Sequence, residues 1–281
     1  MSNDPGPSLF TPLRAQINTR IVNRPQASDA SPFQIDADDK GWLSVWYLLK
    51  EVQNGNITPG KTRITEEFST GPGKNSDLKL GSRLKIREIS ASLRPTVCFS
   101  LLEHRKRRTR VEAPPLEDVD QLHTLRRLVE AGTSRRASRY IDQLRERGDT
   151  TKLNHIKNDF QKLQDAMQQF RDAYEANSDT DHEAEFVDTD LLLHEYVAFL
   201  AGTGKYGVQL VRSIVIKLQL VGLRHPMTTE MLDDIIHEHQ RLIGDITHGQ
   251  PSDAEDAMLA HLNCAASRYD LRAGDRSSAH R

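Results

Sequence analysis

Four side chains of types that bind metals lie on the apolar faces of three expected helices between residues 186 and 265. Asp190 and His194 are one helical turn apart, so both leave the same face of one helix. His239 and His261 each lie on the apolar face of a later helix, as the spacing of the neighbouring Leu, Ile, Ala and Met residues indicates. Three imidazoles and one carboxylate that point into a helical bundle predict a divalent transition-metal site, with zinc, nickel or manganese as the candidate ions.

The alternative for any single histidine is a core residue with a satisfied hydrogen bond, which is the more common case. The joint pattern favours the metal site. His237 falls on the opposite side of its helix, near Asp233 and Arg241, so that His239 is expected to be the inward-facing histidine. Asp190 is difficult to explain as an ordinary core residue, because a buried carboxylate needs a cation or several hydrogen-bond donors.

These motifs resemble the ligand-binding domain of GntR-family transcription regulators of the FadR-like (FCD) subgroup. The resemblance rests on the Asp190-x-x-x-His194 pair, on Glu238-His239 and on His261-Leu262. The run from Leu125 to Glu130 also resembles the first helix of that domain, where an Arg and a Glu occupy these relative positions. The match covers roughly residues 114 to 270. It implies a dimeric bundle of six or seven helices with a central metal that helps to bind a small organic acid.

The expected fold is mostly α, with a variant or shortened N-terminal winged helix-turn-helix domain and a C-terminal antiparallel bundle of six to seven helices. The expected units are a mobile tail over 1–38, an atypical DNA-binding domain over 39–113, an FCD-like effector domain over 114–275 and a second tail over 276–281. Helices of the bundle are predicted at 116–147, 151–177, 188–201, 204–223, 227–248 and 252–272. The fourth is nearly all apolar and is expected to be the most buried.

Helix caps are predicted at two of these starts. Thr228 or Thr229 is expected to cap the fifth segment. Ser252 is expected to cap the sixth, with Glu255 completing a capping box.

The chain is expected to act in the cytoplasm. Its two cysteines, Cys98 and Cys264, do not form a disulfide framework, which fits a reducing compartment. Lys217 and Gln219 interrupt the longest apolar run, so it could not span a bilayer, and the N-terminus lacks a basic-then-apolar secretory signal. The net charge of −2 leaves nucleic acid open as a partner, because an acidic domain can mask a basic one.

A winged helix-turn-helix domain is expected before Ala113-Pro114-Pro115, where consecutive prolines mark a domain boundary. The phrase from Asn54 to Gly60 resembles the link after the first helix of GntR-type domains, and a second such phrase runs from Leu78 to Leu84. About twenty residues separate Ile89 from Val111, where the family commonly uses roughly ten more. The recognition helix is therefore expected to be short or altered.

The run from His104 to Arg110 is the most basic segment and lies where the family has its wing. A solvated charge run is the usual explanation of such a segment, but its position favours contacts to DNA phosphates. The residues expected to contact DNA are Arg83, Lys85, Arg87, Arg94, Thr96, Arg105, Arg107 and Arg108.

An effector site is expected beside the metal. Three histidines and one aspartate leave an octahedral ion with open positions, which the carboxylate of an effector would take in a sensor. The resemblance implies that Arg126 binds the other anionic group of the effector, because arginine pairs bidentately with carboxylates. Arg212 on the fourth expected helix is a second candidate. For each arginine the alternative is an intramolecular ion pair.

The sequence therefore favours a transcription regulator, not an enzyme. Its helical domain would bind a divalent metal and a small carboxylate effector that modulates operator binding, and the resemblance implies a homodimer on double-stranded DNA. One alternative is a metal-dependent enzyme on a helical bundle, against which the lack of a His-Glu-x-x-His motif, a nucleophile elbow and a phosphate loop counts. Another is a metabolite-binding protein that has lost sequence-specific DNA binding, which the shortened recognition region keeps open.

Overall fold

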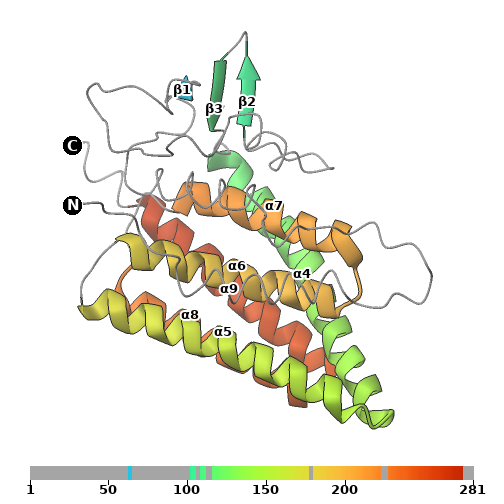
Figure 1. Ribbon diagram of the computed structural model, residues 1–281. Helices are drawn as coiled ribbons and strands as arrows, with labels where there is room; N and C mark the ends of the chain where they lie inside the picture. Colours follow the sequence, from blue (N-terminus) through green and yellow to red (C-terminus); the bar gives the residue numbers. More distant parts are fainter. Residues whose placement is uncertain are drawn as a thin grey trace.

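The computed structural model describes residues 63–64, 102–105, 108–111, 116–176, 180–222 and 227–274. Six helices form a bundle (Figure 1): α4 (Leu116–Glu146), α5 (Thr150–Ala176), α6 (Thr180–Leu200), α7 (Gly204–Gly222), α8 (Thr229–His248) and α9 (Pro251–Gly274). The helices of the FCD-like domain are thus present in the predicted order. Both predicted tails, and most of the predicted DNA-binding domain, lie outside the described residues.

Three short strands precede the bundle. They are β1 (Arg63–Ile64), β2 (Leu102–Arg105) and β3 (Arg108–Val111), in the sheet order β1-β3-β2 with antiparallel neighbours. Arg105 at the end of β2 lies directly opposite Arg108 at the start of β3. A hairpin therefore occupies the basic segment for which a two-stranded wing is predicted, at the end of the bundle where α4 begins (Figure 1).

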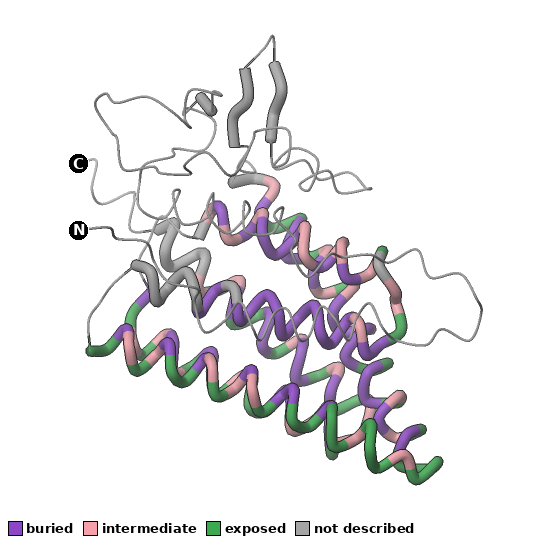
Figure 2. Tube along the Cα trace, viewed as in Figure 1, coloured by how far each residue is buried: buried purple, intermediate pink, exposed green. Residues whose placement is uncertain are grey.

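One hydrophobic core joins all six helices, and α6 lies at its centre. This helix packs against α4, α5 and α7, while α9 packs against α4 and α8. Figure 2 shows α6 buried along its described side chains, whereas the outer face of α5 is exposed. No helix in the described part of the chain is long and apolar enough to cross a membrane.

Two predictions about α6 and α7 are wrong. The third helix begins at Thr180, eight residues before the predicted start at 188. The added residues include Phe186 and Val187, whose buried side chains extend the apolar face of the helix into the core. The most buried helix is α6 and not α7, since every described side chain from Phe186 to Leu200 is buried except Phe199, whereas α7 carries the exposed Tyr206.

Local signals explain where several helices begin and end. Gly148 follows α4 with a φ of 67°, a left-handed conformation that suits glycine after a helix. The hydroxyl of Thr228 accepts from the Met231 amide at 3.3 Å, which confirms the predicted cap of α8. The predicted Ser252 cap is wrong, because α9 already begins at Pro251, a residue suited to the first helical position. The carboxylate of Asp253 instead accepts from the Gln250 amide at 3.0 Å.

His123 on α4 gives the bundle a predicted pH dependence. Burial, followed by the charges of Arg126 and Arg127, lowers its pKa from 6.5 to about 4. The unfolded chain therefore binds a proton at this histidine at a higher pH than the folded chain does. As a result, the free energy of unfolding decreases as the pH falls from 6.5 towards 4. We expect His123→Leu to remove about 2 kcal/mol of the acid-induced loss of stability, measured by urea unfolding of metal-free protein at pH 7 and pH 4.5. His237→Leu, at an exposed histidine, is the control, and an equal pH dependence in wild type and His123→Leu would contradict this account.

Candidate metal centre

The structure brings the four predicted donors together at the centre of the bundle. Asp190 and His194 come from α6, His239 from α8 and His261 from α9. One donor atom from each residue lies within 4.8 Å of the donor atoms of the other three. The three histidines are at most 2% exposed and Asp190 is 8% exposed, so the cluster is shielded from bulk water. Within the described residues, the cluster is a group of nitrogen and oxygen donors that could hold a metal ion.

Carboxylates beside two of the imidazoles favour one tautomer of each ring. Nδ1 of His194 lies 2.5 Å from Oε2 of Glu130, a contact that favours a proton on Nδ1. Nδ1 of His261 donates to Oε2 of Glu238 at 2.8 Å. Because each Nδ1 carries the proton, the Nε2 atom of each neutral ring presents a lone pair. Carboxylates in this position orient imidazoles that bind metals.

The third imidazole presents its Nε2 in the same way. Nδ1 of His239 lies 3.2 Å from Sδ of Met167, and a thioether can only accept a hydrogen bond. Nε2 of His239 is buried and lies 3.2 Å from Oδ1 of Asp190, but no hydrogen bond of good geometry to it exists among the described residues. Both atoms are hydrogen-bond acceptors, and no proton lies between them. A cation bound between the two would satisfy both.

The donor set fits a divalent transition metal. Nε2 of His194 lies 3.2 Å from Nε2 of His261 and 3.6 Å from Oδ1 of Asp190. Lone pairs that face each other at these distances repel unless a positive charge lies among them. Imidazole nitrogens with one carboxylate oxygen suit zinc, nickel, iron and manganese, and the set does not distinguish among these ions.

Burial and neighbouring charges set the protonation of the cluster. Burial lowers the pKa of His239, and it lowers the pKa of His261 to about 3, so both rings are neutral. Burial alone would raise the pKa of Asp190, but the neighbouring imidazoles of His194 and His239 outweigh burial and hold that pKa well below its usual value. Burial also opposes a charge on His194, yet the Glu130 carboxylate raises its pKa overall. His194 is therefore the donor at which a proton competes most strongly with a metal ion.

Two arginines lie around the donors. Arg126 is 2% exposed, and its Nε donates to Oε1 of Glu130 at 2.6 Å. Its Nη2 donates to Nε2 of His194 at 2.9 Å, which again requires a lone pair on that nitrogen. Arg268 donates to both carboxylate oxygens of Glu238 at 2.7 Å. Burial opposes the charge on Glu238, but Arg268 and His261 outweigh it and lower the pKa of this carboxylate to about 2. Both carboxylates that orient the histidines are therefore ionised.

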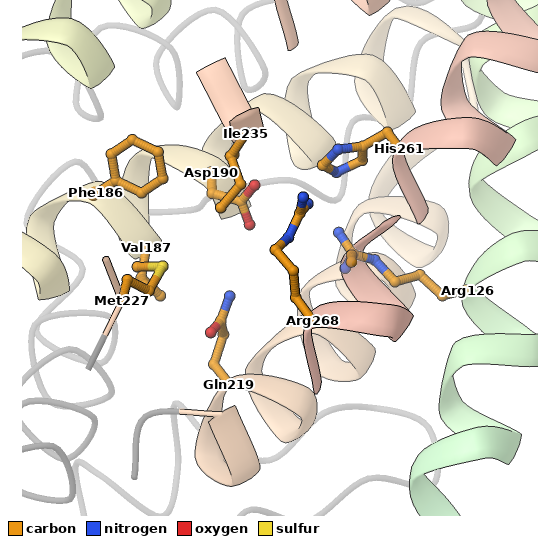
Figure 3. Close-up of a pocket in the computed structure, with 10 residues that line it drawn as sticks. Arg126, Phe186, Val187, Asp190, Gln219, Met227, Ile235, His261 and Arg268 are labelled. Carbon is orange, nitrogen blue, oxygen red and sulfur yellow. The ribbon is translucent and has the colours of Figure 1, made fainter. Parts of the chain in front are cut away.

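A cavity opens beside the cluster (Figure 3). The empty space between its lining atoms is about 510 Å³ when the open solvent at its mouth is included. Asp190, His261 and both arginines line it, with Gln219 of α7 and a group of apolar side chains. In Figure 3 Arg126 and Arg268 point towards the same space, next to His261 and Asp190. A small anion in the cavity would therefore reach both the donors and the guanidinium groups.

The two predicted effector-binding arginines have different surroundings. Arg126 lines the cavity. It also forms an intramolecular ion pair with Glu130, which was the alternative to effector binding predicted for this residue. Arg212 lies outside the lining of this cavity and donates to both carboxylate oxygens of buried Glu195, at 2.6 and 2.9 Å. The geometry thus gives Arg212 a role in joining α6 to α7, and we do not include it in the effector site proposed below.

The predicted DNA-binding residues fall mostly outside the described part of the chain. Arg105 and Arg108 belong to the hairpin of β2 and β3. The rest lie outside the described residues, namely Arg83, Lys85, Arg87, Arg94, Thr96 and Arg107.

Sequence reasoning missed two polar residues that line the cavity, Arg268 and Gln219. Arg268 lies seven residues after His261, and this spacing places both on one face of α9. Gln219 is one of two polar residues, with Lys217, in the otherwise apolar run from Ile214 to Val221, which is a signal that a side chain faces a polar site. Both could have been found from helical periodicity.

Comparisons with known proteins agree with this architecture. Residues 117–263 match the FCD domain family, which is more than half of the 281-residue chain. The fold is similar to that of E. coli McbR/YncC, with a TM-score of 0.57 and 14% sequence identity over 82% of this chain and 97% of that chain. Streptococcus agalactiae GntR matches with 19% identity and a TM-score of 0.34, over 80% of this chain and 98% of that chain. No curated protein matches the chain.

The helical bundle with a buried donor cluster and an adjoining cavity defines a ligand-binding domain of the FCD type. The chain belongs to the GntR family of transcription regulators, in the subgroup that carries an FCD domain. The predicted resemblance is confirmed.

Proposed function

We propose that the chain is a cytoplasmic, homodimeric transcription regulator whose bundle binds a divalent metal and a small organic acid, and whose N-terminal domain binds double-stranded DNA. The observation that carries the proposal is the convergence of Asp190, His194, His239 and His261. This cluster adjoins a cavity that Asp190, His261 and Arg126 line. A divalent ion held by these donors would offer its open positions to the carboxylate of the effector.

Arg126 couples the two binding events in this proposal. Its Nη2 donates to the same His194 lone pair that would bind a metal ion, and one lone pair cannot serve both. Arg126 must then find another acceptor, and it already lines the cavity. The carboxylate of an effector is the acceptor that would replace His194. Metal binding thereby prepares Arg126 for the effector.

The route from the effector site to DNA runs through α4. Arg126 lies on this helix, which begins at Leu116, and the hairpin that ends at Val111 precedes it closely in the chain. A change in the partners of Arg126 would bias the position of α4 and hence of the two DNA-binding domains in a dimer. No observation favours catalysis over this sensing role, and we propose no enzymatic activity.

DNA binding is tested by its salt dependence. The basic hairpin is expected to contact phosphates, so Arg107→Gln combined with Arg108→Gln should reduce the slope of log K against log salt by about 2. The measurement is fluorescence anisotropy of a random-sequence duplex with the full chain. A double variant of Arg135 and Arg241, both to Gln on the bundle, removes the same charge and should leave the slope unchanged.

Preference for a particular DNA sequence is a separate question. It is tested by selecting the duplexes that the full chain binds from a pool of random sequences. Enrichment of a palindrome-like site would support a dimeric regulator. Salt-sensitive binding without enrichment would support the hairpin and contradict base readout. Lack of binding even at low salt would favour a metabolite-binding protein.

A further inference from the structure

The cavity beside the donor cluster is divided into a charged side and an apolar side. Arg126, Arg268 and His261 lie together on one side in Figure 3, whereas Phe186 and Met227 lie on the other. The remaining apolar lining residues are Val187, Ile235 and Ala265. All five apolar residues are buried in the bundle, at 8% exposure or less. A ligand that fills the cavity must therefore combine a charged end with an apolar part.

The fixed charges around the cavity limit the charge that a ligand can carry. Three carboxylates contact the histidines, namely Asp190, Glu130 and Glu238. Two guanidinium groups, Arg126 and Arg268, pair with two of these carboxylates. With neutral histidines the set has one excess negative charge, and with a divalent cation it has one excess positive charge. A single carboxylate neutralises the loaded cluster, whereas a second one would be buried without a counter-charge.

We propose that the effector is a monocarboxylate with an apolar tail. The carboxylate lies between Arg126 and the donor cluster, and the tail lies against Phe186, Met227 and Ile235. Gln219 adds no charge to this count, and its amide can bind a hydroxyl or carbonyl oxygen of the ligand. The inference rests on the proposed function and narrows its organic acid to one class.

The first test compares ligands on the full chain loaded with the ion that elemental analysis finds in the purified protein. Isothermal titration calorimetry of acetate, butyrate, hexanoate and octanoate should show the dissociation constant falling about three- to fourfold per methylene until the apolar side is filled. Hexanedioate should bind about tenfold or more weakly than hexanoate, because its second carboxylate meets the apolar side.

Met227→Gln tests the apolar side with little change of volume. It should reduce the gain in affinity per methylene while leaving acetate binding within about twofold, because acetate has no tail to reach residue 227. Met231→Gln is the matched control, since Met231 lies on α8 outside the cavity lining and should keep the gain. An equal gain per methylene in Met227→Gln and wild type would overturn the placement of the tail.

A charge swap tests the other side. Glu238→Gln removes one partly buried negative charge and leaves the loaded cluster with two positive charges in excess. The preference should then shift towards hexanedioate by about tenfold relative to hexanoate. Adding Arg268→Gln to Glu238→Gln restores the charge count, and the preference for hexanoate should return. A role of Glu238 only in holding His261 would weaken both acids equally, and this result would overturn the charge argument.

The outcomes separate this inference from the proposed function. If dicarboxylates bind the loaded wild-type protein more tightly than monocarboxylates, or chain length has no effect, the inference is wrong and the organic-acid sensor remains. If none of these acids binds the loaded protein, the effector part of the proposed function fails as well.

Discussion

His239→Ala is expected to release the bound metal. The substitution removes one of three imidazole donors from a buried site, and even the loss of a residue that only orients a ligand typically costs about 10- to 100-fold in metal affinity. We expect a loss of more than about 100-fold for the ligand itself. The measurement is metal per chain after dialysis against a weak chelator.

His237→Ala is the matched control for this substitution. His237 lies on the same helix, two residues away, but it is exposed and its Nδ1 contacts the backbone oxygen of Asp233 at 2.9 Å. It should therefore retain metal at the wild-type level. Equal loss in the two variants would show that unfolding of α8, and not the loss of a ligand, releases the ion.

A carboxylate effector is expected to stabilise the metal-loaded protein and to leave the stripped protein unchanged. A ligand at 100 times its dissociation constant stabilises the state that binds it by about 2.7 kcal/mol. For a domain of this size that corresponds to a rise in Tm of about 5–10 °C. The physical reason is that only the loaded cluster has an excess positive charge to offer to the carboxylate.

Arg126→Ala should reduce this rise by weakening effector binding about tenfold or more. Arg127→Ala is the matched control, because Arg127 is the next residue on α4 and donates to Thr124 at 3.1 Å instead of lining the cavity. The measurement is differential scanning fluorimetry with a panel of organic acids. An equal rise in stripped and loaded protein would contradict the coupling between metal and effector.

The positions of the four donors could be predicted because helical periodicity alone decides which way they face. His237 and His239 illustrate this, since a shift of two residues separates an exposed histidine from one that is fully buried. The periodicity of the apolar residues in the later helices points to the same faces. The helices that carry the donors could therefore be recognised without knowing which residues contact each other in the folded bundle.

The burial of α6 could not be predicted in the same way. Its buried residues include Asp190, His194 and Glu195, which made the segment look less apolar than α7. These polar residues are buried because residues of other helices compensate them, as Arg212 of α7 does for Glu195. Such compensation depends on contacts between helices that are distant in sequence.

The contacts by which two carboxylates orient the histidines could not be predicted for the same reason. Glu130 lies on α4 and Glu238 on α8, and each fixes a histidine of a different helix. Arg268 then fixes Glu238 across the α8–α9 interface. The sequence predicts the direction of each side chain, but the pairing between helices follows only from the packed bundle.

X-ray absorption spectroscopy of the metal-loaded protein tests the central claim most directly. The account predicts one tightly held ion per chain, three imidazole nitrogens with the multiple-scattering pattern of histidine, and oxygen ligands at about 2.0–2.2 Å. His239→Ala loaded at high metal concentration should show fewer imidazoles. A wild-type spectrum with sulfur ligands, or with oxygen ligands alone, would contradict a centre built from Asp190, His194, His239 and His261.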